Sequence, residues 1–214
     1  MEAGDAGGSL NLGLLNGWTL TGMLSLAVVL MAVGIAAAHQ FDVEGMRAVI
    51  RATARTSLLL FCLAFSAAAL LRLWPNGWTR WQRRNRRYLG VAFGVSHGVH
   101  AIAIVSLILV APELLGSAAS TDMLIFGGLG YAFIVAMVAT SFYGTAALLG
   151  PRAWRVLHWV SVHFIWLSFV ATFGKRTGAN PAYWGFIAVL LAVMALRLVV
   201  WRRSPARTRA SAAA

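Results

Sequence analysis

Charged side chains are scarce in this chain, and acidic ones are the scarcest. Only 11% of the 214 residues are charged and only six are Asp or Glu, whereas 60% are hydrophobic. With a mean hydropathy of +0.76, the chain has too few polar side chains to cover a soluble domain. We therefore expect lipid to surround most of it. All six acids lie near the ends of apolar runs, so no carboxylate within the membrane would couple proton transport.

Two further kinds of chemistry lack the residues they need. The lone cysteine, Cys62, excludes an intramolecular disulfide and disfavours metal-thiolate chemistry. No glycine-rich phosphate loop follows a strand-like run, and the apolar runs leave no room for a nucleotide-binding domain. A reductant is therefore expected to come from a separate protein or a small molecule. The acidic, glycine-rich start of the chain differs from a cleavable signal peptide, so we expect the first helix to be retained.

Long apolar runs are what the chain has in abundance. Each is close to the ~20 residues that a helix needs to cross the hydrocarbon core. The sequence therefore predicts an all-α, polytopic membrane protein with a bundle of six transmembrane helices. The predicted spans are 18–38, 56–74, 88–111, 123–149, 153–173 and 181–201. They form one domain, 18–202, between an N-terminal tail, 1–17, and a basic C-terminal tail, 203–214, which we expect to be disordered.

The net charge of +12 comes from 17 Arg and one Lys, which lie mainly at the ends of the apolar runs. This placement is typical of topology signals and of contact with membrane lipids, and it argues against nucleic-acid binding. Most arginines fall in the second-to-third and fourth-to-fifth connections and in the C-terminal tail. The third-to-fourth connection carries only the acids Glu113 and Asp122. We therefore expect both termini to be cytoplasmic, although the acidic N-terminus and the Lys175–Arg176 pair do not fit this rule.

All five histidines lie in or at the edge of predicted spans: His39, His97, His100, His158 and His163. A strongly polar side chain in hydrocarbon costs several kcal/mol unless something binds it. Imidazole is also the commonest metal ligand in proteins. The histidines are therefore candidate ligands of b-type haem. The alternative is a set of hydrogen bonds between helices without a cofactor, which is the favoured interpretation for His39.

A haem held between two helices needs one imidazole from each helix at a similar depth. Spans three and five run in the same direction. At about 1.5 Å per residue, His97 and His100 lie about 15 and 20 Å beyond the last arginine before span three. His158 and His163 lie about 5 and 12 Å beyond the last arginine before span five. By depth, His163 pairs best with His97 and next best with His100, which leaves His158 beside this site or on another haem.

Several short runs resemble the ferric-reductase-like transmembrane domain superfamily. These are RRYLG at 86–90, TSF at 140–142, LG at 149–150 and WRVLH at 154–158. Within that superfamily they are most similar to the haem-binding membrane subunit of the methionine sulfoxide reductase system. The resemblance implies that His100 is the outer ligand of span three, that His158 is the inner ligand of span five, and that Arg86 occupies the inner position of span three. The expected outer histidine of span five would fall at Ala171, which cannot bind iron, so one haem is expected rather than two.

The predicted function is that of a membrane cytochrome b in a bacterial inner membrane. It would pass electrons from a cytoplasmic or quinol donor to an acceptor on the outer side, as an oxidoreductase subunit with a separate redox partner. Arg86 or Arg87 could pair with haem propionates. Two other hypotheses stay open at this point. One is a haem-free transporter or assembly subunit, and the other is a family member that has lost its haem.

Overall fold

The computed structural model describes residues 15–113 and 121–203, and within them it contains six α-helices. The helices are α1 (Gly17–Ala38), α2 (Val43–Leu73), α3 (Gly77–Val110), α5 (Thr121–Ala139), α6 (Tyr143–Gly174) and α7 (Tyr183–Arg202). The all-α fold class is confirmed. All of these helices except α5 are long and apolar enough to cross a membrane, as expected of a multi-pass integral membrane protein. The predicted tails lie almost wholly outside the described residues.

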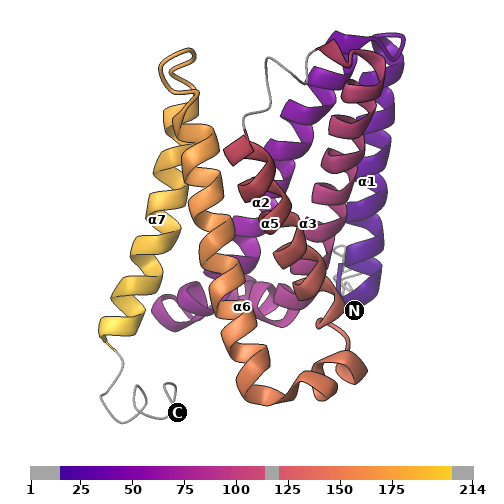
Figure 1. Ribbon diagram of the computed structural model, residues 1–214. Coiled ribbons are helices and arrows are strands. Elements are labelled where there is room, and N and C mark those ends of the chain that lie inside the picture. The colour runs from indigo at the N-terminus through magenta and orange to yellow at the C-terminus, as the bar shows by residue number, and fades with distance from the viewer. Residues whose placement is uncertain (1–14, 114–120, 204–214) are drawn as a thin grey trace, which may run out of the picture.

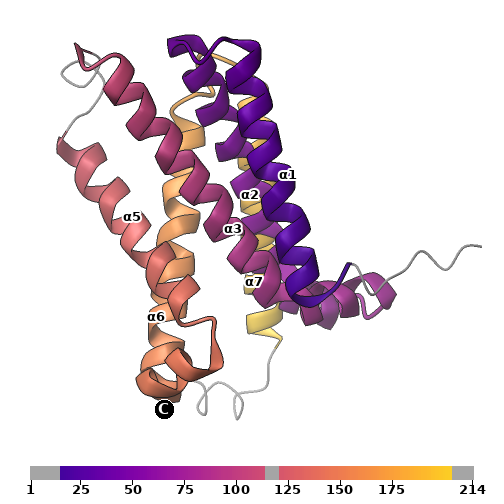
Figure 2. The ribbon, with the colours of Figure 1, turned by 90° about the vertical axis from the view of Figure 1, so that its right-hand side faces the viewer.

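The helices pack side by side around a common interior (Figure 1). Going round the bundle, α2 packs on α3, α3 on α5, α5 on α6, α6 on α7, and α7 again on α2. The first helix, α1, lies outside this ring against α2 and α3, as Figure 2 shows from a second direction. The start of α1 and the end of α7 lie at the same end of the bundle. Across the interior of the ring, α3 faces α6.

Two helices begin earlier than the apolar runs predict. Asp42 caps α2 by accepting a hydrogen bond of 2.6 Å from the Gly45 backbone N–H. Asn76 and Thr79 form a capping box at the start of α3, in which each side chain accepts from the other residue's backbone N–H. The arginines at 47–55 and 80–87 were therefore wrongly predicted as connections. They belong to the first turns of α2 and α3, because capping starts a helix before its apolar stretch begins.

The fourth predicted span, 123–149, is too long. Helix α5 ends at Ala139, and its apolar stretch, Leu124–Ala139, is shorter than that of the other spans. The Thr140 and Ser141 hydroxyls donate back to the carbonyls of Ala136 and Met137, both at 2.7 Å, which competes with continuation of the helix. A second break follows at Gly150, whose φ of 73° lies in the left-handed region before Pro151.

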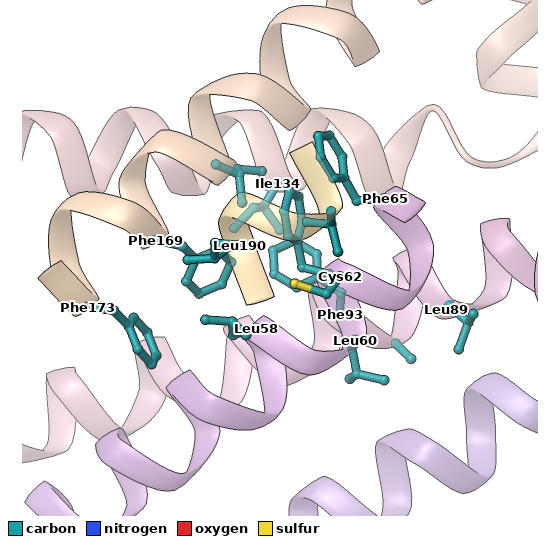
Figure 3. Packing of buried hydrophobic residues seen from close by; sticks show 14 of the residues in the cluster. Leu58, Leu60, Cys62, Phe65, Leu89, Phe93, Ile134, Phe169, Phe173 and Leu190 are labelled. Carbon is teal, nitrogen blue, oxygen red and sulfur yellow. The ribbon is translucent and has the colours of Figure 1, made fainter. Parts of the chain in front are cut away.

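An aromatic cluster fills the middle of the ring. The ring centroid of Phe61 on α2 lies 5.7 Å from that of Phe93 on α3 and 5.5 Å from that of Phe169 on α6. Figure 3 shows Phe93, Phe169 and Ile134 of α5 meeting in this cluster. Outward-facing side chains are also apolar, and Leu109 is 76% exposed, which suits a surface in contact with lipid. The aromatic side chains come from α2, α3 and α6, and Ile134 comes from α5, so the cluster separates α3 from α6 at mid-depth.

Candidate functional site

Two cavities lie within the ring, one on each side of the aromatic cluster. The inner cavity, of about 400 Å³, lies toward the end of the bundle where α1 begins and α7 ends. The outer cavity, of about 490 Å³, lies toward the opposite end, beside the start of α2 and the connection between α6 and α7. Phe61 and Phe93 line the inner cavity, Phe169 lines the outer one, and Ile134 lines both. Both volumes fall within the ~300–1,000 Å³ typical of cofactor sites.

His97 and His100 line the outer cavity from α3. The Nδ1 atom of His100 is 3.1 Å from the Ile50 carbonyl oxygen and 3.0 Å from the Thr53 hydroxyl. A carbonyl can only accept, and the Thr53 hydroxyl donates its own proton to the Val49 carbonyl at 2.7 Å. Nδ1 of His100 therefore carries the proton and donates to both oxygens. Its Nε2 atom keeps the lone pair, and metal-binding histidines are commonly held in this way.

His97 lies about one helical turn before His100 on α3, and its ring centroid is 5.2 Å from that of His100. It is also 5.3 Å from the ring of Tyr131 and 6.0 Å from the ring of Phe169. Its buried Nδ1 atom and the buried Tyr131 hydroxyl find no hydrogen-bond partner among the described residues. His97 is thus less firmly oriented than His100, although both face the same cavity.

Four arginines line the outer cavity with the histidines. Arg47, Arg51 and Arg55, spaced four residues apart on α2, form what we call the outer arginine row, and Arg176 joins it from the end of α6. Arg55 and Arg176 both donate to the hydroxyl of the buried Tyr183, at 3.4 and 3.5 Å.

Carboxylates offset little of this positive charge. Arg47 pairs with Glu44 at 2.8 Å. The structure gives Arg51, Arg55 and Arg176 no carboxylate partner within the part of the chain that it describes. The outer cavity therefore has a surplus of positive charge along one wall, which suits an anionic group in a ligand.

The inner cavity brings together His158 of α6 and Arg86 of α3. The Nε2 atom of His158 is 3.1 Å from the Thr140 hydroxyl, which donates its own proton to the Ala136 carbonyl. Nε2 of His158 therefore carries the proton, and the ring stacks on Trp154 with centroids 4.2 Å apart. The Nε2 atom, the ring nitrogen farther from the backbone, therefore has no lone pair available to bind iron in this arrangement.

The structure does not place His163 opposite His97 or His100. His163 lines neither cavity, and its ring lies against Phe65 and Trp159 while Nδ1 donates to the Trp159 carbonyl at 2.6 Å. The α6 side chain beside His97 is Phe169. The pairing of His163 with His97 depends on Arg87 and Arg155 lying at the same depth in the bundle.

The register of the two helices explains the difference. Arg86 shares its cavity with His158, so Arg155 lies about one turn nearer the inner end of the bundle than Arg87 does. Every distance counted from Arg155 was therefore one turn too deep. The family resemblance, by contrast, implies different depths for His100 and His158, and the structure places these residues in separate cavities.

Two other predicted positions fall outside both cavities. His39 is exposed and ends α1, where its backbone N–H donates to the Ile35 and Ala36 carbonyls. Ala171, where the family pattern has a histidine, is exposed and lines neither cavity. The neighbouring Ser168 and Thr172 line the outer cavity instead.

The outer arginine row was the main feature missed from sequence. Its signal was the spacing of 47, 51 and 55, which places three arginines on one face of a helix. The predicted spans place this stretch in a connection, where helical spacing has no meaning.

The three comparisons with known proteins returned no match: no family model, no curated protein and no solved structure matches this chain. Within the described residues, no group of three or more His, Cys, Asp or Glu side chains could hold a metal ion. The candidate site is therefore characterised by its own residues, which are imidazoles and guanidiniums around an apolar cavity.

Proposed function

We propose that this chain is a membrane b-type cytochrome that carries electrons through the bilayer, with one haem b in the outer cavity. The observation that supports this best is that the cavity combines three features that haem b requires. An imidazole with an anchored Nδ1 suits the iron, and apolar walls suit the macrocycle. Guanidiniums without a carboxylate partner among the described residues suit the two propionates. Such a combination has no evident use in a bundle that only needs to pack.

The residues of the outer cavity would divide the work of holding haem. His100 would bind the iron through Nε2, because its Nδ1 proton is donated to Ile50 and Thr53. Arg51 and Arg55 would pair with the propionates. Ile104 and Phe169, among the apolar lining residues, would exclude water. When bound, haem b supplies a one-electron iron couple, whose potential responds to the axial imidazole and to a dry environment.

In this proposal the inner cavity lies on the side nearer the electron donor. Arg86 and His158 line it together, and the ferric-reductase-like resemblance implies an inner position for both. We propose a single haem because the Nε2 atom of His158 is held by Thr140.

One electron would enter from a cytoplasmic reductase or a quinol, and one would leave to an acceptor on the outer side. In this proposal both partners are separate molecules. We place the protein in a bacterial inner membrane, with both termini cytoplasmic, as an oxidoreductase subunit of the ferric-reductase-like superfamily.

An optical spectrum tests the proposal. The full chain is expressed with ample haem, purified in detergent and measured before and after reduction with dithionite. We expect a Soret band and a reduced α band of b type, with close to one haem per chain. His100→Ala should lose the haem, and His163→Ala, the matched control on α6, should keep it. A protein that folds but shows neither band would contradict the proposal and favour a haem-free transporter, an assembly subunit or a family member that has lost haem.

A further inference from the structure

We propose that the outer cavity supplies a single axial ligand to the iron, and that the other axial position is open to a small uncharged ligand. The inference rests on the proposed function. It differs from a closed electron carrier, in which two side chains occupy both axial positions. The cavity would then bind an exogenous molecule at the iron as well as pass electrons.

The histidines of this chain provide one ligand to that cavity at a time. All five are described by the structure, and two of them, His97 and His100, line the outer cavity. They lie three residues apart on one face of α3, so only about 4.5 Å of helix separates them. Because both imidazoles project from the same helix, a porphyrin macrocycle placed between them would run into the α3 backbone. The two imidazoles therefore cannot hold one iron from opposite sides.

The opposite wall of the cavity offers no second imidazole or sulfur ligand. Its α6 residues are Ile165, Ser168, Phe169, Thr172 and Phe173. Neither Cys nor Met is found among the side chains that line this cavity. Tyr183 is the remaining side chain of a type that can bind haem iron, and its hydroxyl accepts from Arg55 and Arg176.

Ser168 and Thr172 give the open side a small polar patch. The Ser168 hydroxyl donates to the Phe164 carbonyl at 2.9 Å, so its oxygen is left as an acceptor. Phe169 and Phe173, which line the same wall, are buried. Weakly polar hydroxyls in an apolar wall suit a small uncharged molecule better than an ion.

Carbon monoxide is the experimental ligand for a test, since it binds ferrous haem that has a free axial position. The full-length holoprotein in detergent is reduced with dithionite and titrated with CO while the Soret band is recorded. We expect a saturable shift of the Soret band in the whole haem population. Ser168→Ala and Thr172→Val should shift the stretching frequency of bound CO. Ser141→Ala, a matched hydroxyl deletion in the inner cavity, should leave that frequency unchanged.

Two results would overturn the inference, and they are distinguishable. Haem that is present but insensitive to CO shows a second axial side chain and leaves the cytochrome function standing. If Tyr183→Phe then makes that haem sensitive to CO, Tyr183 is the second ligand. A protein without haem contradicts the proposed function itself, and this inference fails with it.

Discussion

The outer and inner cavities contain the same kinds of residue and differ in how their histidines are held. Each combines histidine and arginine within apolar walls, and the two share Ile134. His100 donates through Nδ1 and keeps Nε2 available, whereas the Nε2 proton of His158 is donated to Thr140. An imidazole in a membrane cavity is therefore a candidate iron ligand only when its Nε2 atom keeps a lone pair, as in His100. Four predictions, in order of decreasing effect, test this difference.

Replacing the histidines should have the largest effect. We expect His100→Ala to reduce the haem content of the purified protein at least tenfold, because it removes the axial ligand. His158→Ala should retain most of the haem. The pyridine haemochrome assay, normalised to protein, measures both variants. If His158→Ala loses haem and His100→Ala keeps it, the two cavities have been assigned the wrong way round.

Replacing arginines should have the next largest effect. The double change Arg51→Gln and Arg55→Gln removes two guanidiniums beside the proposed propionates, and we expect roughly tenfold weaker haem binding. The matched control, Arg83→Gln with Arg84→Gln, removes the same charge from the lining of the inner cavity. Haem titration into apoprotein gives both affinities. Equal weakening in the two double variants would mean that net charge, and not the outer arginine row, favours the haem.

Removing one acceptor from the His100 ring should have a smaller effect. Thr53→Val keeps the shape of this fully buried side chain and deletes the hydroxyl 3.0 Å from Nδ1. The Ile50 carbonyl still accepts, so we expect only several-fold weaker haem binding and a change in midpoint potential. Redox titration of the holoprotein measures the potential. No change in either quantity would show that Thr53 does not orient the ligand.

The smallest effect is expected at the matching threonine of the inner cavity. Thr140→Val deletes the hydroxyl that His158 contacts. We expect unchanged haem content and a loss of about 0.6 kcal/mol in stability, the usual size of one hydrogen bond between membrane helices. Thermal denaturation in detergent, followed by circular dichroism, measures the stability. A second haem in this variant would show that Thr140 alone prevents His158 from binding iron.

The arrangement of the candidate site could be predicted only in part. The residue types were evident from sequence, because histidines in an apolar span are costly and therefore informative. Their partners were not evident, since depth was counted from arginines that lie at different levels on α3 and α6. His163 was expected to share a haem with His97, yet it packs against Phe65 and Trp159.

The sequence by itself determined the all-α fold class and the multi-pass membrane character, because apolar runs of membrane length leave few alternatives. It also indicated that the histidines are candidate ligands. The resemblance to the ferric-reductase-like superfamily implied that His100 and His158 lie at different depths. Only the tertiary structure decided which side chains line the same cavity. It also decided which nitrogen of each imidazole keeps a lone pair that could bind iron. Those properties depend on helix register and rotation and on neighbours such as Thr53 and Thr140, which lie 47 and 18 residues from their histidines.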